Sequence, residues 1–153
     1  MTADLSPADR LAIEWQCEKL VRSFANLSDA KDADGLAALF TEDGAFARPT
    51  DPANPIRGRE AIRASFAGRP KERLTRHLCA NTVIEVLGPD RARGHSTVLL
   101  FTAKADPASS APPVADAVQL VGEYRDTFAL VDGRWHFAER VGSVTLSFKG
   151  APA

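Results

Sequence analysis

Hydrophobic residues recur every three or four positions between Ile13 and Leu27, which predicts a long helix with one apolar face. Ser6 can cap the start of this helix, and Pro7 suits its first position because an N–H is not needed there. The apolar face consists of Ile13, Cys17, Leu20, Val21, Phe24 and Leu27. Such a face needs an apolar surface to pack on, and we expect a sheet.

The pattern after residue 28 is shorter and more broken. A run of acidic residues interrupts the apolar stripe, and residues 35–40 then predict a short helix with Asp32 or Asp34 as its cap. Asp43-Gly44 predicts a turn, residues 45–48 a short strand, and residues 49–55, with their prolines, a loop. Residues 59–66 predict a third helix that ends at Gly68.

The second half of the chain is rich in residues that favour strands. Four long strands are predicted over residues 73–87, 91–103, 117–131 and 134–148. Asp132-Gly133 indicates a tight hairpin, and residues 104–116 form a longer loop. Helices followed by an antiparallel meander predict the α+β fold class.

Composition limits the function classes. The chain has 153 residues, 44% of them hydrophobic, which fits one globular domain spanning 1–153. Its two cysteines have no CxxC spacing, so we expect neither disulfides nor zinc, and a cytoplasmic location. Without a long apolar run, we expect no membrane partner.

Charge is balanced overall but unevenly distributed. The net charge of -1 argues against a nucleic-acid partner. Residues 57–76 nevertheless carry seven basic residues against two acidic ones. A solvated helix face and loop is the favoured interpretation, with an anion-binding rim as the alternative.

Strand alternation suggests where chemistry could lie. His77 should share a face with Cys79, Asn81 and Val83, and Asp126 lies in an otherwise apolar row with Tyr124. If these faces and that of His95 line one concavity under the first helix, a pocket would hold two histidines and one or two carboxylates. A carboxylate bound to one ring nitrogen of a histidine leaves the other nitrogen free as a base.

Structural roles remain open for each of these residues. Either histidine could be an ordinary core or surface residue, Asp29 a helix-terminal carboxylate, and Asp126 a cross-strand partner. No Gly-rich phosphate loop, GxSxG elbow, HExxH or Cys/His metal spacing is present. A pocket that needs no cofactor and no metal is what these observations favour.

Several weak motifs occur in an order that resembles a known family. They are the Asp29, Lys31, Asp32, Asp34 break, GLAALFTEDGAF, RGREAI, Thr75-Arg76-His77-Leu78 with Asn81, GEYRD and DGRWHF. Together they resemble the SnoaL-like branch of the nuclear transport factor 2-like superfamily, over roughly residues 9–148. The resemblance implies a cone: a strongly curved mixed sheet wrapped around the long first helix, with two further short helices and a homodimer formed through the sheet.

The resemblance also implies site residues. Scytalone dehydratase and hexachlorocyclohexane dehydrochlorinase, members of this branch, use an Asp and a His at positions similar to Asp29 and His77, and His95 is similar to a further dehydratase His. The dehydratase has a Tyr before the Asp where this chain has Ser28, so its substrate is not carried over. The remaining candidates for substrate contact are Tyr124, Asp126, Arg140, Ser28, Phe24 and Trp15.

We therefore expect a dehydratase-like lyase or isomerase that abstracts a proton from a small apolar or aromatic molecule. His95, Tyr124 or Arg140 would donate to the developing oxyanion or leaving group. The alternative is a non-catalytic ligand-binding module or dimeric accessory or scaffold module of the same fold. An Asp29 carboxylate within hydrogen-bond reach of His77, beside an apolar cavity, would favour catalysis.

Overall fold

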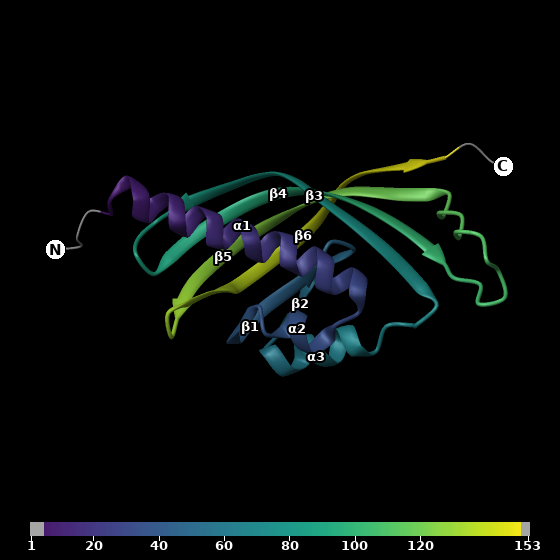
Figure 1. Ribbon diagram of the computed structural model, residues 1–153, viewed down its shortest axis with the longest axis horizontal. Helices are drawn as coiled ribbons and strands as arrows, with labels where there is room; N and C mark the ends of the chain where they lie inside the picture. Colours follow the sequence, from purple (N-terminus) through teal and green to yellow (C-terminus); the bar gives the residue numbers. More distant parts are fainter. Residues whose placement is uncertain (1–4, 151–153) are drawn as a thin grey trace.

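A long helix crosses the concave side of a curved sheet in the computed structural model, which describes residues 5–150 (Figure 1). This helix, α1 (Pro7–Ala30), begins as predicted. The Ser6 hydroxyl accepts a hydrogen bond from the Asp9 backbone, and the Asp9 carboxylate accepts one from the Ser6 backbone, which together form a capping box. The helix ends at Lys31, whose left-handed φ of 59° turns the chain away.

The short helix and first strand differ from their predicted bounds. Helix α2 (Ala33–Ala37) is capped by Asp32, one of the two predicted caps, and ends before Phe40. Strand β1 (Phe40–Arg48) begins at Phe40 because this residue pairs with Phe137 in the sheet. The turn predicted at Asp43-Gly44 lies inside β1, where the register with β6 shifts between Phe40 and Ala45. The polar pair therefore marks a bulge rather than a chain reversal.

The prediction of a loop over residues 49–55 is wrong. Strand β2 (Asp51–Arg57) pairs antiparallel with β1. Its two prolines hide the strand pattern, but β2 is an edge strand, where a missing N–H interrupts no second ladder. Helix α3 (Arg59–Ala67) follows and ends at Gly68 as predicted.

The four long strands form the predicted antiparallel meander. They are β3 (Arg73–Val86), β4 (Arg91–Lys104), β5 (Val118–Val131) and β6 (Arg134–Lys149). Asp132 and Gly133 turn β5 into β6 with φ values of 49° and 75°, as a two-residue hairpin loop requires. Strand β1 pairs parallel to β6, which gives a mixed sheet in the order β2-β1-β6-β5-β4-β3. The α+β cone fold is therefore confirmed.

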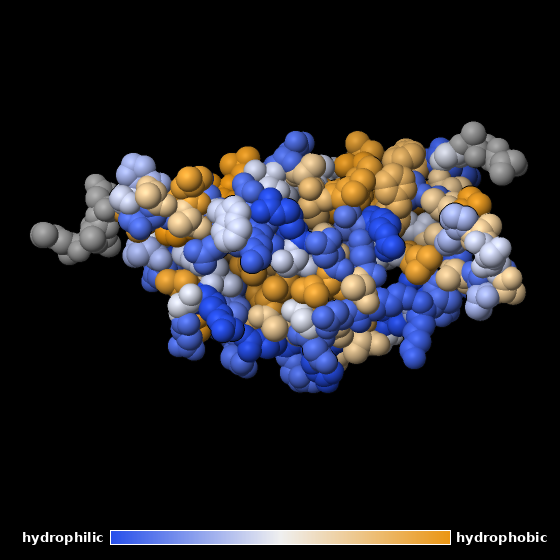
Figure 2. Space-filling model, in the orientation of Figure 1, coloured by the Kyte–Doolittle hydropathy of each residue, from blue (hydrophilic) through white to orange (hydrophobic). Residues whose placement is uncertain are grey.

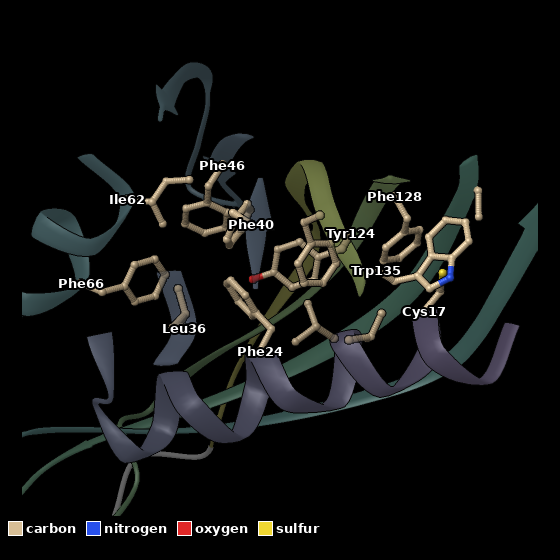
Figure 3. Close-up of a cluster of buried hydrophobic side chains, with 14 of the residues drawn as sticks. Cys17, Phe24, Leu36, Phe40, Phe46, Ile62, Phe66, Tyr124, Phe128 and Trp135 are labelled. Atoms are coloured by element: carbon tan, nitrogen blue, oxygen red, sulfur yellow. The ribbon is translucent and has the colours of Figure 1, made fainter. Parts of the chain in front are cut away.

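The core is centred on Phe24, which rises from α1 into a group of aromatic rings (Figure 3). Its ring centroid lies 5.4 to 6.1 Å from those of Phe40, Phe46, Phe66, Tyr124 and Phe137. Aromatic pairs at these distances each add about 0.5–1.5 kcal/mol beyond the burial of their area. This packing fixes the C-terminal half of α1, and with it the last helical turn that carries Ser28 and Asp29.

A bulge in β3 changes which residues face the helix. Asn81 has a positive φ of 51°, and the register with β4 shifts between Ala80 and Val83. Val83 is consequently 66% exposed, whereas His77 is largely buried. The prediction that His77 and Val83 share one face is wrong, because strict alternation fails across the extra residue.

The visible face of the molecule carries both polar and apolar side chains (Figure 2). Figure 2 shows mostly hydrophilic side chains over the outward side of α1 and over α3. Among the helices within residues 5–150, none combines the length and the apolar run needed to cross a bilayer.

Candidate functional site

A cavity of about 300 Å³ lies between the C-terminal half of α1 and the sheet. Its volume is at the small end of the range for small-molecule sites. Most of its wall is apolar or aromatic, with side chains from α1, β1, β4, β5 and β6. These residues are Phe24, Phe46, Val98, Leu100, Leu120, Tyr124 and Val144.

Asp29 and His77 meet at the wall of this cavity. Asp29 is in the last turn of α1, and His77 is on β3, which packs beside that helix. Oδ1 of Asp29 lies 2.6 Å from Nδ1 of His77, and Oδ2 accepts a hydrogen bond from the His77 backbone N–H at 2.9 Å. The two contacts hold both the main chain and the ring of the histidine against one carboxylate.

The surroundings of Asp29 favour its ionised form. Burial by itself raises the pKa of this carboxyl, but hydrogen bonds from the His77 ring, the His77 backbone and the Thr75 hydroxyl outweigh burial and lower it. An ionised carboxylate only accepts hydrogen bonds, so Nδ1 keeps the proton and donates a hydrogen bond to Asp29. Within residues 5–150, no side chain or backbone group bonds to Nε2, and His77 lines the cavity. Nε2 is therefore left without a protein partner, as a base acting on a molecule in the cavity would require.

Three of the residues predicted to contact substrate line the cavity: Phe24, Ser28 and Tyr124. The Tyr124 side chain is buried, and burial raises its pKa to about 12, so the phenol keeps its proton at neutral pH and can donate a hydrogen bond. Ser28, which stands where the dehydratase pattern has a tyrosine, accepts a hydrogen bond from Arg69 at 3.1 Å.

The prediction that His95 shares the cavity with His77 is wrong. Leu100 is paired with His77, so the even-numbered residues of β4 face the helix and His95 faces away. Its Nε2 lies 2.5 Å from Oε2 of Glu123, and its side chain is 45% exposed. The apolar run in β4 has leucines on both faces, so its pattern could not show which face is buried.

Three other predicted substrate contacts also lie outside the cavity. Trp15 is 56% exposed on the outer side of α1, with the Lys19 ammonium 5.3 Å from its ring centre. Arg140 and Asp126 are fully buried next to the cavity and form an ion pair at 3.4 Å. The Arg140 guanidinium lies 3.9 Å from the ring centre of Tyr124, so it supports the cavity wall rather than lining it. Asp126 and Arg140 were misplaced because periodicity gives a face and not a position along it, whereas Trp15 does not belong to the apolar face of α1 at all.

The two cysteines are packed thiols. Cys17 is fully buried, and burial raises its pKa to about 12. Burial also raises the pKa of Cys79. Neither is in a disulfide, and in the described part of the chain no three His, Cys, Asp or Glu side chains are grouped to hold a metal ion.

Sequence reasoning missed three residues of the site. Thr75 donates a hydrogen bond to Oδ1 of Asp29 at 2.9 Å, and its position two residues before His77 on the same strand was the available signal. Arg48 and Arg69 line the cavity. The basic stretch that contains Arg69 gave a signal for an anion-binding rim, whereas nothing in the sequence singled out Arg48.

Solved structures with the same fold come from several bacteria. The chain is similar to a candidate scytalone dehydratase from Novosphingobium aromaticivorans, with 24% identity and a TM-score of 0.78 over 97% of this chain and 94% of that one. It is similar to a hexachlorocyclohexane dehydrochlorinase, LinA type 2, with 18% identity and a TM-score of 0.79 over 97% and 95%. A variant of a protein of unknown function from Mycobacterium tuberculosis is 30% identical, with a TM-score of 0.73 over 91% and 76%.

The sequence comparisons agree with the fold. No curated protein matches the chain. Residues 9–141, most of the chain, match the family described as the SnoaL-like domain. The chain therefore belongs to the SnoaL-like family, as its ordered motifs predicted.

Proposed function

We propose that this protein is a cofactor-independent lyase or isomerase in which His77 removes a proton from carbon in a small apolar or aromatic substrate. The observation that carries the proposal is the 2.6 Å contact between Asp29 and Nδ1 of His77 at the wall of an apolar cavity. The carboxylate fixes the tautomer and stabilises the imidazolium that forms. A proton-transfer group held in this way contributes roughly 10²–10⁴ in rate.

The electrons of the broken C–H bond have two possible destinations. In an elimination they form a double bond as hydroxide leaves the neighbouring carbon and takes up a proton to become water. In an isomerisation they form an enolate that is protonated at another carbon. Tyr124 is the donor in reach of the cavity, and its phenol, with a pKa raised to about 12 by burial, would stabilise the developing oxyanion.

The names of two structural relatives support the lyase class. A dehydratase and a dehydrochlorinase both carry out eliminations, in which a proton is lost from carbon as the neighbouring group leaves. These names describe those proteins, and their identity with this chain is below one quarter, so they add to the argument from Asp29 and His77 without replacing it.

A panel of β-hydroxy ketones tests the proposal, with the aldol adduct of benzaldehyde and acetone as the first probe. Its dehydration gives a conjugated enone that can be followed by ultraviolet absorption, and proton exchange without elimination can be followed in deuterium oxide by NMR. We expect His77→Gln to lose nearly all activity and His95→Gln to retain it. Full turnover by His77→Gln would refute the proposal.

The same panel separates catalysis from the ligand-binding alternative. A non-catalytic module would bind members of the panel, seen as a rise in thermal stability, while turnover and exchange stayed at the rate measured without protein. A scaffold module would neither bind nor turn over any of them.

A further inference from the structure

The cavity is apolar inside, but four cationic side chains line it: Lys31, Arg48, Arg69 and Arg73. They come from the end of α1, the end of β1, the segment between α3 and β3, and the first residue of β3. Among the described residues, no aspartate or glutamate lines the same cavity. An otherwise apolar site therefore has cationic groups and no lining carboxylate to balance them.

Two of these cations are already engaged. Arg73 pairs with Asp116 at 2.7 Å and donates to the Thr102 hydroxyl. The Lys31 ammonium donates to the backbone carbonyls of Pro70 and Lys71, which ties the end of α1 to the segment after α3. Both side chains therefore connect segments of the cavity wall, and their donors are already used by the protein.

Within the described residues, Arg48 and Arg69 each donate one hydrogen bond and form no ion pair. Arg48 donates one long hydrogen bond, 3.4 Å, to the backbone carbonyl of Ser65. Arg69 donates to the Ser28 hydroxyl at 3.1 Å, and its guanidinium lies 3.9 Å from the ring centre of Phe66. Burial lowers the pKa of Arg69 and the positive charge of Arg48 lowers it further, while the more distant charge of Asp29, which is bound to His77, only partly offsets them.

Arg48 and Arg69 differ from the other arginines of residues 5–150 in being half-buried without an ion pair. Ion pairs are formed by Arg22, Arg59, Arg63, Arg73, Arg91, Arg93, Arg125 and Arg140. Those without an ion pair that lie exposed to water are Arg10, Arg57, Arg76 and Arg134. Only Arg48 and Arg69, in the described part of the chain, are half-buried and lack a carboxylate. A partly buried charge is costly unless it is paired, so this arrangement points to a ligand that supplies the pairing.

We propose that Arg48 and Arg69 bind the carboxylate of an organic acid whose apolar body fills the cavity. The planar guanidinium fork matches a carboxylate in a bidentate manner, and Phe66 and Ser28 hold the Arg69 fork in place before the ligand arrives. The apolar wall suits an aromatic or aliphatic body. This inference rests on the proposed function, since it names the substrate class: an aryl or alkyl carboxylic acid with an acidic C–H that faces His77.

Isothermal titration calorimetry with matched acids and amides tests the inference on the full chain. The probes are hydrocinnamate against hydrocinnamamide and naphthylacetate against naphthylacetamide, which have similar shapes and differ in charge. For the acid that binds more tightly, we expect an affinity roughly 10- to 100-fold higher than that of its amide, which is the range for hydrogen bonds to a charged group. This preference should fall as salt is added.

Variants locate the source of the preference. The double variant Arg48→Gln, Arg69→Gln should bind acid and amide equally, whereas Arg57→Gln, an exposed arginine outside the cavity, should behave as the wild type. Because Arg69 packs on Phe66, Arg48→Gln alone is the second test, and it should reduce the preference without lowering the unfolding temperature. Arg69→Lys keeps the charge and should retain part of the preference.

Three results would overturn the inference: equal binding of acid and amide to the wild type, a preference that persists in the double variant, or no binding of either acid. The outcome is separable from that of the proposed function. His77→Gln should keep the carboxylate preference even though it loses turnover. Turnover of neutral ketones without any preference for acids would refute the anion site and leave the role of His77 standing.

Discussion

Replacing Asp29 by asparagine is the sharpest test of how the site is organised, because the change preserves shape and removes one function. The carboxylate accepts hydrogen bonds from the Thr75 hydroxyl, the His77 backbone and Nδ1 of His77. An asparagine oxygen can keep accepting the backbone bond, but its amide group then faces Nδ1 as a donor. The imidazole ring must then carry its proton on Nε2, and Nε2 can no longer act as a base.

The magnitude follows from these contacts. A hydrogen bond to a charged group contributes about 1.5–3 kcal/mol and a neutral one about 0.5–1.5 kcal/mol. Asp29→Asn removes the charge from all three bonds and reverses the one to Nδ1, so we expect a loss of about 2–4 kcal/mol in unfolding free energy at neutral pH. The effect on catalysis is larger than on stability. A histidine held in the wrong tautomer should lose roughly 10²–10⁴ in turnover.

Nitrogen-15 NMR of the ring provides a readout that needs no substrate. The wild type should show a protonated Nδ1 and a free Nε2, and Asp29→Asn should show the reverse. Thr75→Val is the matched control, because it removes one hydrogen bond to Asp29 without touching the ring. A variant that keeps the wild-type tautomer and full turnover would refute the role assigned to Asp29.

Stability as a function of pH tests the same contact independently. The folded-state pKa of Asp29 is lowered, so its contribution is fully present above the ordinary value of 3.8 and is lost as pH falls through the lower folded value. In denaturant unfolding, the difference in unfolding free energy between the wild type and Asp29→Asn should therefore become smaller as the pH is lowered. A gap that stays constant down to the acid limit of folding would contradict the ionised state of Asp29.

Three further substitutions probe the surroundings of the site. A Cβ added at Gly122 would collide with the backbone oxygen of Ser143, so Gly122→Ala should lower the unfolding free energy by about 1–3 kcal/mol in denaturant melts, and an unchanged value would contradict this packing. Burial raises the pKa of Asp126 from 3.8 to about 6, so the carboxyl stays protonated to a higher pH in the folded protein than in the unfolded chain. As pH rises from 3.8 to 6, the unfolding free energy of the wild type should fall by about 3 kcal/mol relative to that of Asp126→Asn. Unfolding free energies that change in parallel with pH would count against this. His95→Gln removes only an exposed pair on the outer face, so it should leave unfolding temperature and turnover nearly unchanged, and a large loss of turnover would place His95 back beside His77.

Local sequence signals were sufficient to place the elements whose ends are set by a helix cap or a tight turn. Ser6, Pro7 and Asp9 determined where α1 starts, and Asp132-Gly133 determined the last hairpin, because caps and tight turns depend on a few neighbouring residues. Strand β2 was missed for the opposite reason. Its prolines are acceptable only at an edge, and the edge exists only once β1 has paired with β6.

The candidate site divides in the same way. Resemblance identified Asp29 and His77, and the structure holds the two side chains 2.6 Å apart. His95 was misplaced because β4 carries leucines on both faces, at Leu99 and Leu100, so which face is buried depends on how β4 pairs with its neighbours. The cavity positions of Arg48 and Arg69 required three segments far apart in the chain to come together, which no local pattern reports.

The sequence by itself determined the helices, the four long strands and the side chains that could do acid-base chemistry, since helix caps, turn residues and periodicity act over short distances. The tertiary structure decided which of those side chains share a cavity. Strand register, the bulge at Asn81 and the parallel contact of β1 with β6 are set by pairing across the whole chain. They decide that His77 faces the cavity with Asp29 behind it and that His95 faces away.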